Sequence, residues 1–307
     1  MAGKKEKAVC PVSSPGADFH GTGFHGMDHG PGRGAGPLKI GRISYLNLYP
    51  IFRGLEKTVE REKGRYRFFD GHPAMVNAKL RKGYVDASPS SSIVYLKNPA
   101  DYRLIEGHSI SSDGPIRSIY LFSTLPIKEL GGRTIGVTNQ TETSAALLKI
   151  VSKKFFGVDF RTRVSRLPVA GCLQKYGACL SIGDDAMIAF KRRGKKGGPA
   201  ADFVYDLGLI WKEKTGLPFV YALWIARKDS AVRQKEAFAA FRRHLDQAKL
   251  YALEHLEEAS REKPLKGLAP EEILLYWRGI SYGLGPMEKK GLAQFRKFAK
   301  ELGLLEA

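Results

Sequence analysis

The stretch 134–151, TIGVTNQTETSAALLKIV, carries the pattern on which the fold prediction rests. It runs from an apolar strand at 135–137 through a turn rich in hydroxyl and amide side chains into an apolar helix at 145–151. A strand that leads through a polar turn into a helix is the repeating unit of α/β folds with mostly parallel sheets. Such a turn directs backbone N–H groups and hydroxyls at one point, which suits a small anion such as a carboxylate. The stretch therefore predicts a fold class and a candidate anion site that includes Thr143 and Ser144.

A second stretch, VDASPSSSIV at 85–94, shows the same pattern. Its four serines, broken only by Pro89, fall where a short strand at 85–87 is predicted to turn into a helix. The hydroxyls of Ser90 and Ser91 would then lie beside the first N–H groups of that helix. Two anion sites on two strand-to-helix turns indicate a ligand with two acidic groups.

The regular alternation of strands and helices begins at Leu38 and predicts an α/β fold. Between the strands lie helices such as 72–82 and 185–193. The predicted strands are 39–45, 66–69, 85–87, 102–105, 116–123, 134–137, 164–167, 179–182, 203–206 and 219–226.

The last eighty residues have a helical pattern instead. Apolar residues from Phe238 to Leu256 recur at steps of three and four, which predicts one long helix with an apolar stripe. Two further helices are expected to begin near Pro270 and Pro286.

Two extended runs, 118–123 and 220–225, are interpreted as crossings between two α/β lobes. The first lobe would comprise residues 38–122 and 222–307, and the second would comprise residues 123–221. A cleft between the lobes would bring the two candidate anion sites onto facing walls.

Composition narrows the function classes. The chain has 307 residues, 43% of them hydrophobic, and 50 Lys and Arg against 31 Asp and Glu give it a net charge of +19. Nucleic acid, a membrane surface or an acidic small molecule would all suit that charge. The densest basic run, 191–196, has no interleaved aromatic residues, which favours a solvated loop over a nucleic-acid site.

Residues 1–37 are rich in Gly, Pro and His, and we interpret them as a disordered tail. Its His20, His25 and His29 stand among glycines, so a metal site there is disfavoured. The three cysteines, an odd number, favour a reduced cytoplasmic chain. Neither a signal peptide nor a membrane span is evident.

Several short motifs, in order along the chain, resemble those of the chorismate dehydratase family of futalosine-dependent menaquinone biosynthesis. The motifs are SYLN at 44–47 with Pro50, SPSS at 88–91, SISSDG at 109–114, TS at 143–144, GDDA at 183–186, YDLG at 205–208, TGLPF at 215–219, ISY at 280–282, LG at 284–285 and GL at 291–292. The resemblance extends from Leu38 to the C-terminus and leaves out only the tail.

This resemblance implies a two-lobed fold similar to type II periplasmic binding proteins, with a helical C-terminal segment. It also implies a cytoplasmic hydro-lyase that converts chorismate to 3-[(1-carboxyvinyl)oxy]benzoate without a metal or organic cofactor. The sequence leaves the choice between a monomer and a homodimer open. In that family the substrate's own enolpyruvyl carboxylate is thought to take the proton. The two carboxylates of chorismate agree with the two candidate anion sites.

On this basis Asn47 and Ser90 are predicted as catalytic residues that hold a carboxylate or the departing hydroxyl. The predicted substrate-binding residues are Ser44, Tyr45, Ser91, Ser111, Thr143, Ser144, Gly183 and Asp184.

Each of these predictions has a structural alternative. Asn47, Ser90, Ser91, Thr143 and Ser144 are residue types that cap helices. Asp184 is favoured at the start of a helix by the helix dipole, and Ser111 belongs to a run that suits a turn before a strand.

The chain departs from the family pattern at the second candidate anion site. Thr138 and Glu142 stand where the family commonly has Asp and Arg. An Arg binds a carboxylate bidentately, so its loss matters. Arg42 and Arg117 are candidate substitutes.

Three other functions remain open from the sequence. The first is a non-catalytic protein of the same fold that binds a small acid, and the second is the 1,4-dihydroxy-6-naphthoate-forming lyase of the same pathway. The third is a basic nucleic-acid-binding protein, which would show a steep salt dependence of DNA binding.

Overall fold

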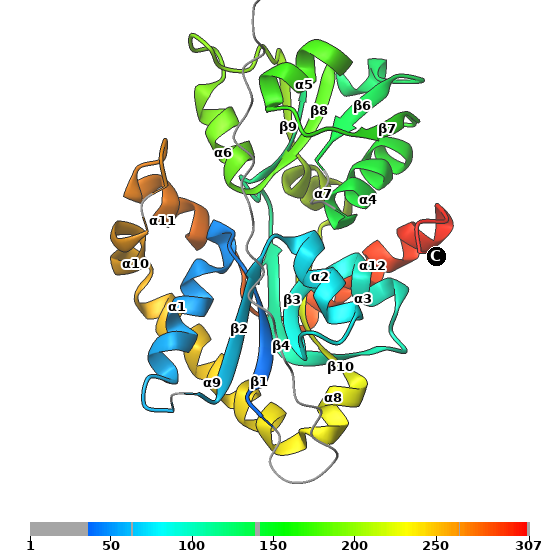
Figure 1. The fold of residues 1–307 in the computed structure, drawn as a ribbon. Helices are drawn as coiled ribbons and strands as arrows, with labels where there is room; N and C mark the ends of the chain where they lie inside the picture. Colours follow the sequence, from blue (N-terminus) through cyan, green and yellow to red (C-terminus); the bar gives the residue numbers. More distant parts are fainter. Residues whose placement is uncertain (1–35, 63, 139–141, 264, 306–307) are drawn as a thin grey trace, which may run out of the picture. The chain divides into compact units, whose positions relative to one another are not determined.

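The computed structural model describes residues 36–305 apart from 63, 139–141 and 264. The predicted tail, 1–37, therefore lies almost wholly outside the described residues, as do its three histidines. Two five-stranded mixed sheets with helices on both faces make up the described part, which confirms the predicted α/β class (Figure 1).

The first sheet has the strand order β2-β1-β3-β10-β4. Strands β1 and β2 are parallel, whereas β10 runs antiparallel between β3 and β4. The strands are β1 (Leu38–Ile43), β2 (Tyr66–Gly71), β3 (Ala87–Ser91), β4 (Tyr102–Ser112) and β10 (Phe219–Arg227).

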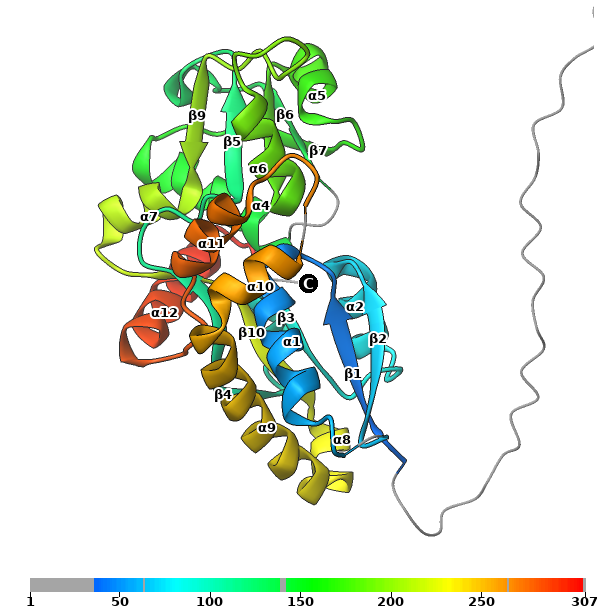
Figure 2. The same cartoon turned by 90° about the vertical axis from the view of Figure 1, so that its left-hand side faces the viewer.

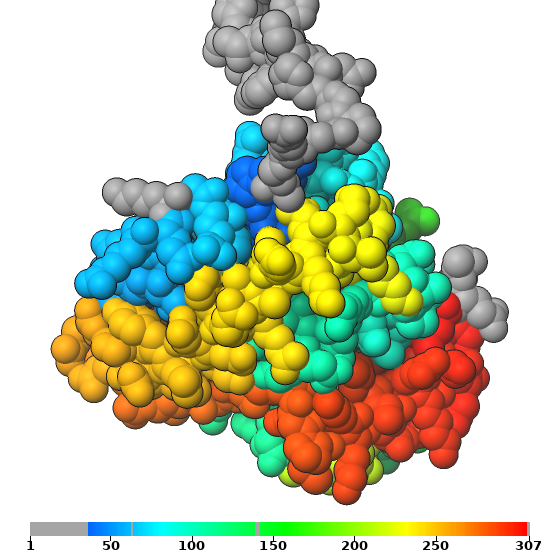
Figure 3. Space-filling view, turned by 90° about the horizontal axis from the view of Figure 1, so that it is seen from below, coloured from blue at the N-terminus to red at the C-terminus, as the bar shows by residue number. Residues whose placement is uncertain are grey.

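Helices α1 and α9 cover one face of the first sheet and α2 and α3 the other (Figures 1 and 2). Rings of Phe52, Trp224 and Phe241 pack together between the sheet and the first pair of helices. Figure 3 shows α9, yellow to orange, lying against α1, which is blue. These helices are α1 (Tyr49–Thr58), α2 (Pro73–Arg81), α3 (Ser92–Lys97) and α9 (Lys235–Glu254), with α8 (Lys228–Arg233) just before α9.

The second sheet has the strand order β7-β6-β8-β5-β9. Cores on its two faces include Phe122, Cys172 and Ala186 on one and Leu121, Leu147 and Trp211 on the other. Its strands are β5 (Ile119–Ser123), β6 (Thr134–Val137), β7 (Arg161–Val164), β8 (Ala178–Ile182) and β9 (Phe203–Asp206), and its helices are α4 (Glu142–Ile150), α5 (Val169–Tyr176), α6 (Gly183–Arg192) and α7 (Leu207–Thr215).

The C-terminal segment is helical, as predicted: α10 (Leu256–Glu262), α11 (Pro270–Arg278) and α12 (Pro286–Glu301) follow α9. Both prolines stand at the first position of their helices, where the missing N–H has no intrahelical partner to lose. The single long helix predicted through Leu256 ends at Glu254, so Leu256 belongs to α10.

The prediction for the two serine runs needs correction. Residues 88–91 lie in β3, where Ser88, Ser90 and Ser91 pair with β10, and only Ser92 begins the helix. The run 109–112 likewise forms the buried end of β4 and not a turn. Serine is not among the β-branched and aromatic residues that favour strands, so these strands depend on pairing with β10, which local sequence does not reveal.

The predicted lobe boundaries, 122/123 and 221/222, fall inside strands. All of β5 pairs in the second sheet, with β8 and β9, and β10 pairs in the first, with β3 and β4, along its length apart from an irregularity at Tyr221. The chain passes between the sheets within 113–118 and, after α7, within 216–218. The division into two lobes stays a prediction, and these are the segments at which it would be drawn.

Candidate active site

A small cavity of about 80 Å³ lies where segments of both sheets meet. Its apolar lining includes Ile43, Ile110 and Ile119. Six of the ten predicted site residues also line it: Tyr45, Asn47, Ser91, Thr143, Ser144 and Gly183. Residues from distant parts of the chain thus contribute to one cavity.

Asn47 lies in a short 3-10 helix, Leu46–Leu48, that three other segments hold in place. The Asp184 carboxylate accepts from the Leu46 N–H at 3.3 Å, and the Trp277 indole N–H donates to the Leu46 carbonyl at 2.7 Å. The Tyr282 hydroxyl donates to the Asn47 carbonyl at 3.0 Å. These contacts fix the backbone that carries the Asn47 side chain.

The side chain of Asn47 does not cap a helix. The cap position of α1 is Leu48, and no side chain makes a capping hydrogen bond there. The Asn47 Oδ1 is buried and has no hydrogen-bond partner among the described residues. A buried polar atom without a partner is costly, and the residue that carries this one lines the cavity, so a ligand bound there is a candidate partner.

The serine run divides between two environments. Strand side chains alternate between faces, so Ser91 reaches the cavity while Ser88 and Ser90 point away from it. The hydroxyls of Ser88 and Ser90 lie 2.9 Å apart and bond to each other. Ser90 does not line the cavity, and its catalytic role stays a prediction.

Thr143 and Ser144 lie in the first turn of α4, and both are buried. The Thr143 hydroxyl accepts a hydrogen bond from the Ile93 N–H, with 3.2 Å between Oγ1 and N. Thr143 thus connects α4 to α3 and closes the cavity on that side.

Gly183 stands beside the ring of Tyr45. Its φ of +65° is a conformation that glycine adopts without strain, and a Cβ there would lie 3.5 Å from the Tyr45 ring. The Gly183 N–H donates to the Ser118 carbonyl at 2.7 Å. Burial, with the charges of Asp184 and Asp185, raises the pKa of Tyr45 well above its usual value, so its hydroxyl stays protonated.

The other predicted residues lie outside the cavity lining. Ser44 is exposed, and Ser111 is buried in β4 with its hydroxyl 3.3 Å from the Ser281 carbonyl. The Asp184 carboxylate accepts a hydrogen bond from the Leu46 N–H instead of lining the cavity. Burial raises the pKa of this carboxyl group.

Neither candidate substitute for the missing arginine reaches the cavity. The Arg42 guanidinium pairs with Asp70 and Glu56, each at 2.5 Å. Arg117 has a φ of +59°, and its N–H donates to the Asp206 carboxylate at 2.8 Å. No Lys or Arg is found among the described residues that line the cavity.

Two polar lining residues were not predicted from the sequence. The Ser118 hydroxyl accepts from the Tyr276 hydroxyl at 3.0 Å, and the Tyr221 hydroxyl lies 3.1 Å from the Ser112 hydroxyl. Both lie in the extended runs that were interpreted as crossings between lobes, 118–123 and 220–225, and the sequence gives no signal that distinguishes them from the other residues of those runs.

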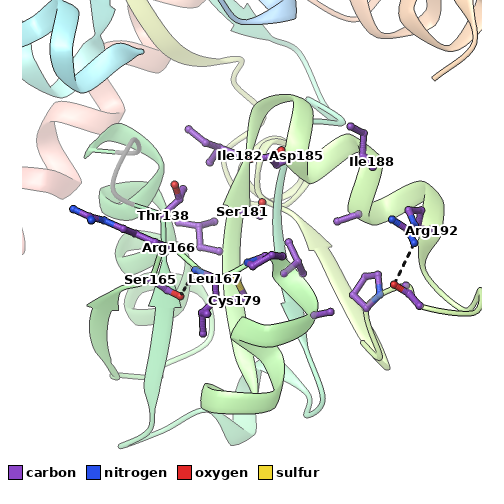
Figure 4. A pocket seen from close by; sticks show the side chains of 18 of the residues that line it. Thr138, Ser165, Arg166, Leu167, Cys179, Ser181, Ile182, Asp185, Ile188 and Arg192 are labelled. Atoms are coloured by element: carbon purple, nitrogen blue, oxygen red, sulfur yellow. Dashed lines mark hydrogen bonds between the residues drawn. The ribbon is translucent and has the colours of Figure 1, made fainter. Parts of the chain in front are cut away.

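A second pocket of about 500 Å³ adjoins the cavity and shares Tyr45 and Ile182 with it. Figure 4 shows hydroxyls at three strand ends in this pocket: Thr138 after β6, Ser165 after β7 and Ser181 near the end of β8. These side chains extend the polar surface along one edge of the second sheet.

As far as residues 36–305 are described, no three His, Cys, Asp or Glu side chains gather as a metal ion would require. In the same part of the chain no helix has the length and apolar character to cross a membrane.

Comparison with known proteins supports both the fold and the family. A protein of Archaeoglobus fulgidus, 18% identical, superimposes with a TM-score of 0.67 over 87% of this chain and 98% of that one. The periplasmic aliphatic sulphonate-binding protein SsuA of Escherichia coli, 15% identical, gives 0.60 over 89% and 95%. These likenesses confirm the predicted periplasmic-binding-protein fold.

A curated protein of Thermus thermophilus named chorismate dehydratase is 28% identical in an alignment of 279 residues that covers 87% of this chain and 96% of that protein. The sequence model of a family described as menaquinone biosynthesis matches residues 38–301. That match covers both sheets and the C-terminal helices up to the end of α12. The chain therefore belongs to this menaquinone biosynthesis family.

Proposed function

We propose that this protein is a chorismate dehydratase, which removes water from chorismate to form 3-[(1-carboxyvinyl)oxy]benzoate in the futalosine route to menaquinone. The observation that carries the proposal is Asn47, which lines a cavity together with hydroxyl-bearing residues and whose buried amide oxygen has no hydrogen-bond partner within the described part of the chain. An amide offers a donor and an acceptor, and both suit a substrate that bears carboxylates and a hydroxyl. Family membership and the relative named chorismate dehydratase support the same activity.

The reaction places modest demands on the protein. A ring C–H bond breaks, its electron pair forms a ring double bond, and the neighbouring C–O bond breaks as hydroxide leaves and combines with the proton. The product ring is aromatic, so the reaction is strongly favoured. The protein's tasks are then to orient the substrate and exclude water.

The cavity supports a reaction in which the substrate supplies its own base. Tyr45 and Tyr221 are the titratable side chains among its described lining residues. Burial raises the pKa of both hydroxyls, so at neutral pH they donate hydrogen bonds and do not accept protons. A carboxylate of chorismate is therefore the first acceptor of the ring proton in this proposal, and the leaving hydroxide then takes that proton to form water. Asn47 and Ser91 hold the reacting groups.

Substrate entry requires the cavity to open. Its volume of about 80 Å³ is well below the roughly 300 Å³ at which pockets for drug-sized ligands begin. The Thr143–Ile93 hydrogen bond spans the closing side, so we propose that it breaks when substrate enters and re-forms or is replaced when the site closes.

Purified protein incubated with chorismate tests this proposal. The expected product is lighter than chorismate by one water and has a benzoate ultraviolet spectrum, and a no-enzyme control measures spontaneous decay. If chorismate binds and persists, the small-acid-binding function replaces the proposal. If it does not bind, the dihydroxynaphthoate-forming lyase is the next candidate. The proposal also includes chorismate as the small-molecule partner and a cytoplasmic location.

A further inference from the structure

A groove of about 870 Å³ lies on the first-sheet part of the molecule and shares no lining residue with the candidate active site. It runs between the start of β4 and helices α8 and α9. Figure 3 shows this face, where the yellow helices α8 and α9 lie beside the blue-green segment around residues 100–110.

Basic side chains surround the groove. Five of its lining residues are cationic and exposed, and no side-chain hydrogen bond or ion pair within the described residues involves them: Arg103, Lys228, Lys235, Arg242 and Arg243. The two acidic lining residues have other neighbours, since Glu106 pairs with Lys289 at 3.0 Å and Asp246 lies 2.9 Å from His108. The groove therefore carries a surplus of at least three positive charges.

The floor of the groove is apolar and well packed. Tyr102, Ala226 and Ala231 are 4%, 1% and 5% exposed, and Tyr95 and Phe238 are half-buried beside them. Aromatic side chains offer flat surfaces on which a planar ring packs favourably. A concave site with an apolar floor and a few charged groups at its rim is typical of small-molecule binding.

We infer that this groove binds an organic phosphate with a planar ring and three or more negative charges, the nucleoside triphosphate class. Arg guanidinium groups match phosphate oxygens bidentately, and the arginines come from both walls, Arg103 from β4 and Arg242 from α9. A ligand with a single carboxylate would leave most of the surplus charge unpaired. The inference is independent of the proposed dehydratase activity.

The test is a calorimetric titration of the full chain with ATP, without magnesium, at about 150 mM salt so that weak surface attraction is screened. The test variant is Arg103→Gln with Arg242→Gln, which removes one cation from each wall. The matched control is Arg163→Gln with Arg278→Gln, because these exposed arginines lie outside the groove and the charge change is the same. Inorganic tripolyphosphate is titrated as a probe that has the charge but no ring.

We expect the wild-type chain to bind ATP, the groove variant to bind at least tenfold more weakly and the control to change less than twofold. Tripolyphosphate should bind at least fivefold more weakly than ATP. An equal loss in both variants would show diffuse attraction to a basic protein and overturn the site. No binding of ATP at millimolar concentration would overturn the site as well. If tripolyphosphate bound as tightly as ATP, the inference that the ligand carries a planar ring would be overturned.

Discussion

At the scale of single residues, Asn47 is the side chain whose role the structure defines most sharply. Its Oδ1 is buried without a partner among the described residues, and its backbone is held by Tyr282. Replacing it by Ala removes an oriented polar group, and losing one such donor commonly costs about 100-fold in turnover. We expect Asn47→Ala to lower turnover of chorismate at least tenfold, while Gln174→Ala, an exposed amide on α5, leaves it unchanged. Normal turnover in Asn47→Ala would remove Asn47 from the site.

Gly183 offers a second test at this scale. A side chain at its φ of +65° is strained by about 1–2 kcal/mol, and a Cβ there would meet the Tyr45 ring. We expect Gly183→Ala to lower the free energy of unfolding by about that amount and to reduce turnover. Gly131→Ala is the control, because its added Cβ would have no neighbour within 4 Å. Equal denaturation midpoints for the two variants would contradict the prediction.

At the scale of elements, the contact between α3 and α4 depends on the Thr143 hydroxyl. Thr143→Val keeps the shape and leaves the buried Ile93 N–H without its acceptor, which costs about 1–3 kcal/mol. Thr143→Ser retains the hydroxyl. We therefore expect the Val variant, but not the Ser variant, to unfold at lower denaturant concentration and to turn over chorismate more slowly. Indistinguishable Val and Ser variants would show that this hydrogen bond does not connect the helices in solution.

Strands β3 and β4 show why the positions of the elements were predicted better than the pairing of strands within the sheets. Short apolar runs such as 134–137 and 203–206 match β6 and β9 residue for residue, because strand patterning is local. The serine runs in β3 and β4 carry no such pattern, and they are strands because β10 pairs with both of them. That pairing joins residues more than a hundred positions apart, which local sequence does not record.

At the scale of the whole molecule, stability should fall in mild acid because of His108. This side chain is 2% exposed, and burial together with the Lys249 charge lowers its pKa to about 4. Between pH 6.5 and 4 the unfolded chain binds a proton there that the folded chain does not, so lowering the pH favours unfolding. We expect about 2–3 kcal/mol of stability to be lost from about pH 7.5 to 4.5 through this group. A His108→Gln variant should lose less over the same range than wild type or the half-buried control His255→Gln, and equal losses would contradict the assignment.

The first strand of the fold, β1, begins at Leu38, and the family match begins at the same residue. A chain that lacks residues 1–37 should therefore turn over chorismate at the wild-type rate and keep its thermal midpoint. An inactive truncated protein would assign a function to those residues.

The sequence by itself determined the α/β class and the approximate positions of the ten strands, because strand patterning and helix starts are local properties, although β4 extends to Ser112, well beyond its predicted end at residue 105. The strand-to-helix patterns and the family resemblance together predicted six of the residues that line the cavity. The tertiary structure alone decided which hydroxyls face the cavity, since Ser90 and Ser91 differ only in the face of β3 on which they lie. It also decided that Ser118 and Tyr221 belong to the site, that Asp184 holds the Asn47 backbone segment, and that five cations from β4, α8 and α9 meet at one groove. Each of these depends on contacts between distant parts of the chain, and such contacts form only when both sheets are assembled.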